Sequence, residues 1–255
     1  MKKSLGFFII ALMLPAISSA SSLDGYKQTV IDSLSRFEET DRDQWSFSVE
    51  RIQRSGATTK TSVESFNPSV NLGNSKASPW SLLKENKKTP DEKRLASYQK
   101  QMSKREEERK ANKEKAAEDG GSKDVLIAMI KLDSLEITQQ EDHQVILSFT
   151  PLVEDMDEES LEYLAGEIII DTNNNYVSQV KIKNIGKLTP AFSVTLKKFL
   201  LLFEFIKIEE HILPLNIVSE ISGKVAFMKS IKEYSSDSYS DYRYLDTEYV
   251  IPPEG

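Results

Sequence analysis

Hydrophobic and polar residues follow two different periods along the chain. Between residues 24 and 40 the apolar side chains, Val30 and Leu34 among them, recur every three or four positions. This spacing predicts an amphipathic helix that buries one face. From residue 45 to 49 apolar and polar positions alternate, as they do in a half-buried strand. Residues 59–66 repeat the alternation after a short turn, so the two segments are expected to form a hairpin.

The chain beyond residue 125 consists mainly of further alternating segments separated by short turns. The strands predicted there are 135–137, 144–152, 167–171, 176–183, 192–208, 212–221, 224–233 and 239–245. A short acidic helix is expected at 155–164, and Ser222-Gly223 is expected to form a turn. Successive strands with short connections indicate an antiparallel sheet of up-and-down connectivity. The predicted fold class is therefore α+β, with an antiparallel sheet covered by the N-terminal helix and by helical insertions.

The predicted strand 192–208 is unusual because both of its faces are hydrophobic. Its inward positions change phase at Lys197-Lys198, and a β-bulge there would restore one continuous apolar face. The residues expected on this inward face are Ile182, Phe192, Val194, Phe199, Leu201, Phe203 and Phe227. They form either a packed core or a hydrophobic cavity for a ligand. The second apolar face, which includes Leu200 and Leu202, is expected to be covered by the N-terminal helix or by an apolar ligand.

Residues 84–118 differ from the rest of the chain because they carry 12 basic and 8 acidic side chains. Thr89 followed by Pro90 is typical of a helix start with Thr89 as the N-cap, and Gly120-Gly121 is typical of a helix end. The apolar positions that share one face of this predicted helix are Leu95, Tyr98 and Met102. The second half of the helix has nothing to bury. We therefore expect a charged helical arm that lies in solvent or holds a protein partner.

The first twenty residues have the organisation of a secretory signal peptide. Lys2 and Lys3 precede an apolar stretch at 5–17, and small residues follow at the expected cleavage site. No later apolar stretch is long enough to span a membrane. The chain is therefore predicted to lose residues 1–20, to have no transmembrane anchor afterwards, and to work as a soluble periplasmic protein. Residues 21–255 are expected to form a single domain that contains the charged insertion.

Composition restricts the chemistry that the protein can perform. The chain has no cysteine, which excludes disulfides, thiolate metal sites and cysteine nucleophiles. Its net charge of −7 argues against a nucleic-acid partner. His143 and His211 are far apart in the sequence, and the turn at 171–175 lacks the glycine and glutamate that a calcium loop requires. No catalytic residue, metal site or cofactor is therefore nominated.

Several short stretches resemble an uncharacterised branch of secreted proteobacterial proteins with a LolA/LolB-like lipoprotein-carrier fold. The stretches are Trp45-Ser-Phe-Ser-Val, Phe66-Asn-Pro-Ser, Trp80-Ser-Leu-Leu, Thr89-Pro-Asp-Glu, Leu188-Thr-Pro-Ala-Phe-Ser-Val and Gly223-Lys-Val-Ala-Phe. The resemblance implies an open half-barrel whose hydrophobic concave face is lidded by helices. It also implies a non-catalytic protein that binds lipid or acyl chains, possibly those of a lipoprotein. The alternative function is an interaction or assembly protein of the cell envelope that uses the charged arm to hold a protein partner.

Overall fold

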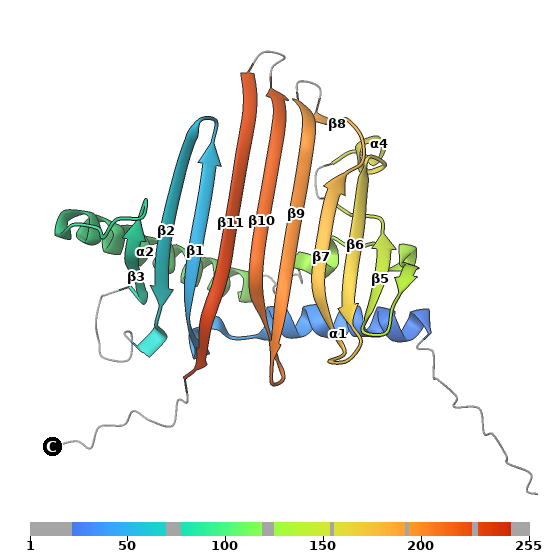
Figure 1. Ribbon diagram of the computed structural model, residues 1–255, viewed down its shortest axis with the longest axis horizontal. Coiled ribbons are helices and arrows are strands. Elements are labelled where there is room, and N and C mark those ends of the chain that lie inside the picture. Colours follow the sequence, from blue (N-terminus) through green and yellow to red (C-terminus); the bar gives the residue numbers. More distant parts are fainter. Residues whose placement is uncertain are drawn as a thin grey trace, which may run out of the picture.

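The computed structural model describes six segments of the chain: residues 22–69, 78–118, 125–153, 156–191, 194–225 and 229–245. The predicted signal peptide lies outside the described residues, and so do Phe192 and Phe227. The described residues form one open antiparallel sheet of eleven strands with few helices (Figure 1). The predicted α+β class, with an antiparallel sheet and an N-terminal helix packed on it, is confirmed.

The described part of the chain forms four helices, two of them short, and eleven strands. The helices are α1 (Leu23–Glu39), α2 (Glu92–Glu118), α3 (Val125–Ala128) and α4 (Glu158–Leu161), with 3-10 turns at Arg42–Gln44 and Leu132–Ser134. The first six strands are β1 (Trp45–Ser55), β2 (Thr58–Phe66), β3 (Trp80–Glu85), β4 (Glu136–Gln140), β5 (Gln144–Phe149) and β6 (Leu164–Asp171). The remaining strands are β7 (Tyr176–Asn184), β8 (Leu188–Ala191), β9 (Val194–Ile208), β10 (His211–Val225) and β11 (Lys229–Tyr244).

The sheet consists of two antiparallel meanders, β1 to β3 and β4 to β11, which meet at the seam where β1 pairs with β11. Its strand order is β3-β2-β1-β11-β10-β9-β7-β6-β5-β4, and β8 pairs beside β9. Strands β1 and β11, which are distant in the sequence, pair from Trp45 opposite Tyr244 to Ser55 opposite Glu233. The up-and-down connectivity expected from the short turns holds within each meander. The β1–β11 pairing, which no local pattern encodes, joins the two meanders into one sheet.

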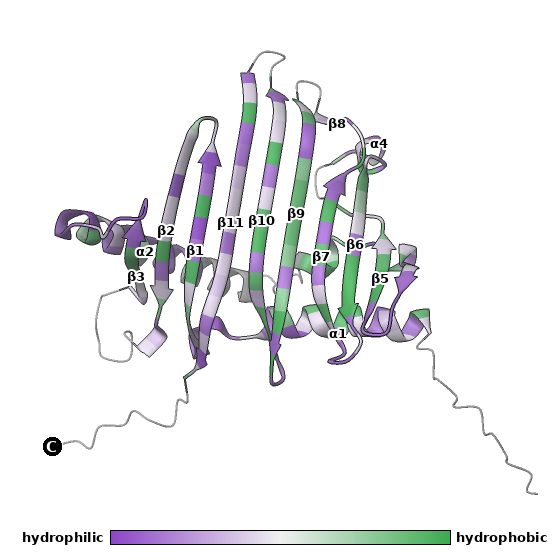
Figure 2. Ribbon diagram, viewed as in Figure 1, coloured by the Kyte–Doolittle hydropathy of each residue, from purple (hydrophilic) through white to green (hydrophobic). Residues whose placement is uncertain are grey.

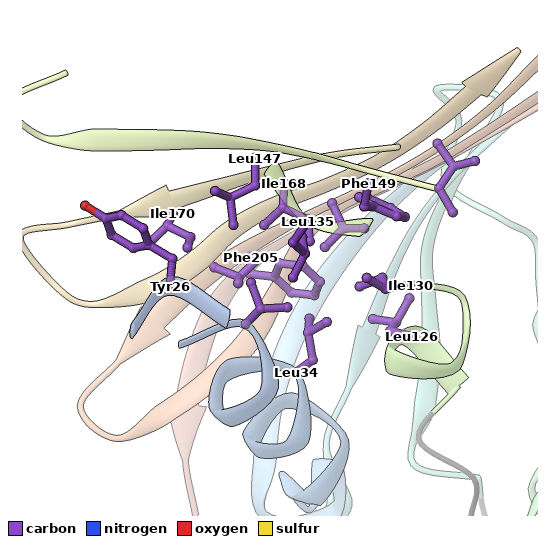
Figure 3. Packing of buried hydrophobic residues seen from close by; sticks show 14 of the residues in the cluster. Tyr26, Leu34, Leu126, Ile130, Leu135, Leu147, Phe149, Ile168, Ile170 and Phe205 are labelled. Carbon is purple, nitrogen blue, oxygen red and sulfur yellow. The ribbon is translucent and has the colours of Figure 1, made fainter. Parts of the chain in front are cut away.

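Helix α1 covers one end of the sheet and buries the face that its spacing predicts. The side chain of Ser22 accepts a hydrogen bond from the Gly25 N–H at 3.3 Å and so caps the helix. Tyr26, Val30 and Leu34 recur at helical spacing and are buried against β6, β7 and β10. Figure 3 shows Tyr26 and Leu34 of this face directed into the main hydrophobic core.

The densest part of this core lies on β5, β6 and β7. Leu147, Ile168 and Val180 stand opposite one another on these three strands, and each is at most 2% exposed. The ring of Phe149 on β5 lies over Gly166 of β6, where an added Cβ would be 2.4 Å from the ring. The glycine therefore makes room for the aromatic side chain that closes this end of the core (Figure 3).

The predicted β-bulge in the long hydrophobic strand is confirmed. Ser222 of β10 pairs with Lys198 of β9, whereas the next residue, Gly223, pairs with Leu196. Lys197 is therefore the extra residue of the bulge, and the inward apolar positions on either side of it fall on one face. Val194 and Leu196 before the bulge belong to the same hydrophobic cluster as the inward residues that follow it.

The turn predicted at Ser222-Gly223 is wrong. Strand β10 continues through both residues to Val225, and β11 begins only at Lys229, so the predicted strand 224–233 is wrong in its boundaries. The glycine at position 223 allows the backbones of β9 and β10 to approach each other closely, and the chain does not turn there. A Cβ at this position would lie 2.1 Å from the carbonyl oxygen of Thr195 on the bulged strand.

Several other boundaries also differ from the sequence predictions. Strand β3 was not predicted, because its short sequence lies between a polar loop and the charged segment. Helix α2 begins at Glu92, and the carboxylate of Asp91 accepts the hydrogen bond from the Arg94 N–H at 2.7 Å, so Thr89 is not its cap. The acidic helix predicted at 155–164 is reduced to α4, because residues from Leu164 onward pair with β7.

Candidate ligand-binding face

Helices α1 and α2 lie on the same side of the sheet, behind it in Figure 1. We call this side the helix-bearing face. One transverse row of side chains crosses it from strand to strand, each residue standing opposite the next. The row consists of Arg51, Asp237, Ile217, Phe203, Val180, Ile168 and Leu147, from β1 to β5. It therefore changes from charged to apolar across the sheet. Figure 2 shows the same gradient, with β6 largely hydrophobic and β11 largely hydrophilic.

Burial also changes along this row. Val180, Ile168 and Leu147 are fully buried at the end that α1 covers. Phe203 and Ile217 in the middle of the row are only half-buried, although Phe203 packs against the main core. Apolar side chains that keep part of their surface exposed side by side are typical of a binding face.

Five of the seven inward residues predicted from the sequence are described, and the structure brings them together. Ile182 stands opposite Leu201 and is 1% exposed. Val194, Phe199, Leu201 and Phe203 are half-buried and pack against the same core cluster. Phe192 and Phe227 lie outside the described residues.

The second apolar face of β9 is not covered by the N-terminal helix, so of the two covers expected for this face the helix is wrong. Leu200 and Leu202 point away from α1, because α1 packs on the core that contains the alternate residues of the strand. Leu202 stands opposite Lys181 on one neighbouring strand and Val218 on the other. Both leucines are half-buried, which is consistent with partial cover by neighbouring side chains on the strands.

The charged end of the row is an ion triad in which Glu64 is buried and Arg51 and Asp237 are half-buried. The guanidinium of Arg51 bonds Glu64 through Nε at 3.2 Å and Asp237 through Nη1 at 2.8 Å. The hydroxyl of Tyr98 on α2 also donates a hydrogen bond to Glu64, at 2.9 Å. Burial raises the pKa of the Tyr98 phenol, and the negative charge of Glu64 raises it further. Burial also raises the pKa of Asp237, although the charge of Arg51 opposes the shift.

Helix α2 is docked on the sheet through its first half and is not a free arm there. Tyr98 and Met102 are buried against Leu82 of β3. The indole N–H of Trp80 donates to Glu106 at 3.2 Å, and Arg109 reaches Asp43 at 3.1 Å. These contacts fix the helix across the end of the sheet where β1, β2 and β3 lie. The apolar positions of this helix were predictable from the sequence, whereas their docking site on β3 was not.

An aromatic cavity of about 160 Å³ lies between α2 and strands β1, β10 and β11. Its aromatic walls are Trp45, Phe47, Phe66, Trp80, Tyr239 and Tyr242. Two buried polar atoms of the lining residues, Trp45 Nε1 and Asp237 Oδ1, make no hydrogen bond within the described part of the chain. The sequence placed Trp45 and Phe47 on one strand face, but nothing in it located the cavity.

The turn at 171–175 and the two histidines were the features of the sequence that most resembled metal ligands. The carboxylate of Asp171 accepts hydrogen bonds from the backbone N–H groups of Asn173 and Asn174, so the turn is closed by its own side chains. The ring of His143 contacts Asn173, whereas His211 packs against the ring of Trp45. Among the described residues, no group of three or more histidine or carboxylate side chains is placed to hold a metal ion.

Across the described segments, no helix is both long and apolar enough to cross a membrane. Comparison with known proteins adds no family to these observations. Neither the protein-family models, nor the curated proteins, nor the solved structures contain a match to this chain.

Proposed function

We propose that the protein is a non-catalytic periplasmic binding protein that holds an acyl chain on the helix-bearing face of its sheet. The observation that supports this proposal is the row of half-buried apolar residues that continues from the packed core onto β9 and β10. Phe199, Leu201 and Phe203 occupy successive inward positions there and each keeps part of its surface exposed. An acyl chain lying along these residues would bury their exposed apolar surface, as α1 buries the apolar residues at the other end of the transverse row.

The physical basis is the transfer of apolar surface out of water. Successive inward side chains on a strand are about 6.6 Å apart, so Phe199 to Phe203 offers a strip of about 13 Å. Each methylene group buried on it contributes about 0.8 kcal/mol. The strip is also flanked on β10 by the half-buried side chains of Ile217 and Ile221, which widen the apolar surface. The proposal agrees with the carrier resemblance seen in the sequence and requires no cofactor.

Two variants of adjacent residues test the proposal. Leu201→Gln places a polar amide on the helix-bearing face, whereas Leu202→Gln makes the same change on the opposite face of the same strand. The chain from Ser21 is titrated with a fluorescent fatty acid, and urea unfolding shows that each variant is folded. We expect Leu201→Gln to weaken binding at least tenfold and Leu202→Gln to leave it unchanged. Absence of binding by the wild type, or equal losses in both variants, would contradict the proposal.

A second candidate function is that of an envelope interaction protein that uses α2 as its contact surface. The observation that favours it is a row of lysines on the outward side of the helix, where Lys93, Lys100 and Lys104 are exposed. Replacing these three lysines by Ser leaves the docked residues of α2 intact. Loss of a co-purifying envelope protein in this variant, with acyl binding absent from the wild type, would favour the second candidate over the first.

A further inference from the structure

The aromatic cavity lies where two strands of the sheet separate. The pairing of β10 with β11 ends where Asn216 stands opposite Ser238, whereas β11 continues beside β1 as far as Tyr244. Aromatic side chains of β1 and β11 line the space that this separation leaves, and α2 contributes Glu106 and Arg109 to the lining. Among the described residues, those that line the cavity do not include the acyl-binding strip on β9.

The walls of the cavity suit a single aromatic ring. The ring centre of Phe47 lies 5.1–5.7 Å from the ring centres of Phe66, Trp80, Tyr239 and Tyr242. Aromatic rings attract one another edge to face or in offset stacks at such distances, so a ring that enters the cavity finds matching partners. The cavity has a volume of about 160 Å³, and an apolar cavity of about 150 Å³ holds one benzene molecule. A second fused ring exceeds this volume.

The charges around the cavity leave one cation without a carboxylate partner. Each carboxylate of the lining has an arginine within 3.1 Å. The pairs are Asp43 and Glu106 with Arg109, and Asp237 with Arg51. Arg42 also lines the cavity, but it makes no ion pair within the described part of the chain. A cationic ligand would therefore meet only carboxylates that are already paired, whereas an anionic ligand would meet Arg42.

Arg42 is placed to bind an anion at the mouth of the cavity. Its side chain is exposed, and its guanidinium lies over Phe37 of α1, 5.8 Å from the ring centre. A guanidinium stacked on a ring keeps its in-plane N–H groups, which can donate to a carboxylate. Burial raises the pKa of the Tyr239 and Tyr242 phenols, and the charge of Arg42 partly opposes both shifts, so this charge acts on the cavity wall. A carboxylate bound at the mouth stays in contact with water and avoids the cost of full burial.

We propose that the cavity binds a small aromatic carboxylate, whose single ring is enclosed by the aromatic walls and whose carboxylate is bound by Arg42. Burial of the ring supplies the affinity, and the guanidinium, which donates hydrogen bonds to the carboxylate, supplies the preference for an acid. This site goes beyond the proposed function, because it requires no acyl chain on β9.

Three ligands that share one ring and one methylene group test the proposal, namely phenylacetate, benzyl alcohol and benzylamine. Both tryptophans of the chain, Trp45 and Trp80, line the cavity, so tryptophan fluorescence reports its occupancy. The chain from Ser21 is titrated with each ligand, and calorimetry should give one site per chain. We expect phenylacetate to bind at least about fivefold more tightly than benzyl alcohol, and benzylamine to bind most weakly. Naphthylacetate, which adds a second ring, should bind at least about tenfold more weakly than phenylacetate.

Arg42→Gln removes the charge and should reduce the affinity for phenylacetate to that for benzyl alcohol. Arg54→Gln is the matched control, because Arg54 also lies over an aromatic ring, 4.8 Å from the centre of Tyr234, but does not line the cavity. It should leave the preference unchanged. If the wild type does not bind phenylacetate, binds all three ligands equally or binds naphthylacetate as tightly, the inference is wrong, whatever the acyl probe shows. An unchanged preference in Arg42→Gln would also contradict it. The wild-type comparison decides the question even if Arg42→Gln does not fold.

Discussion

Replacing Gly223 by Ala should destabilise the sheet at the bulge that aligns its apolar face. The new methyl group would lie 2.1 Å from the carbonyl oxygen of Thr195 and 2.9 Å from the Cα of Leu196. Both atoms belong to the backbone of the paired strand, so no side-chain rotation relieves the clash, and β9 must move away by about 1 Å. Overpacking alone costs about 1–3 kcal/mol, and each weakened ladder hydrogen bond adds about 1 kcal/mol. We expect a loss of about 3 kcal/mol.

Urea unfolding of Gly223→Ala measures this loss, and a thermal scan should show a Tm about 6–12 °C lower for a chain of this size. Ser222→Ala is the matched control, because it changes the preceding residue of β10 without placing an atom against the bulge. Acyl-probe affinity should fall as well, since the bulge brings Val194 onto the same face as Phe199. If the two variants differ by less than about 0.5 kcal/mol, the close approach does not explain the glycine.

Further predictions address the core, the docking of α2, acid stability and processing. Phe205→Ala should cost about 3–5 kcal/mol in urea unfolding, because its ring is 3% exposed, whereas half-buried Phe203→Ala should cost less; equal losses would contradict the binding strip. Tyr98→Phe removes the donor to a buried carboxylate and should cost about 2 kcal/mol, with faster tryptic cleavage of α2 than in wild type. The hydrogen bond from Arg94 lowers the pKa of Glu85, so the stability it provides is present above the ordinary carboxyl pKa and is lost as the pH falls through the lowered value. Unfolding midpoints of Arg94→Met should therefore depend less on pH in that acidic range than those of wild type. N-terminal sequencing of the exported protein should begin at Ser21, and recovery of Met1 on membrane-bound material would refute the predicted cleavage.

The parts of the fold that depend on local periodicity were predictable from the sequence. Helix α1 and the bulge at Lys197 follow from the spacing of apolar residues, because each buries a face that the spacing itself defines. Gly223 was misread, since a glycine needed for a close approach has the same local appearance as a glycine in a turn. The pairing of β1 with β11 was not predictable, because it depends on contacts between residues far apart in the sequence.

The candidate site, like the fold, was predictable from the sequence only where it depends on local periodicity. The inward residues of β9 were found in advance, since alternation along one strand defines a face. The aromatic cavity was not found, because Trp45 and Tyr242 come from strands at opposite ends of the chain and Glu106 comes from α2. Its two unpartnered atoms can be recognised only once these three segments are placed together. The mixed charges of α2 indicated a solvated helix, whereas Tyr98 and Arg109 attach it to the sheet.

The seam between β1 and β11 also determines the order in which the protein can fold. Val49 pairs with Tyr239, about 190 residues later, so closing this contact is slow and entropically costly. Until β11 is in place, β1 to β3 form a separate small sheet whose inner edge is unpaired and exposed to other chains. The sheet is therefore complete only when its last strand, β11, is available to pair with β1.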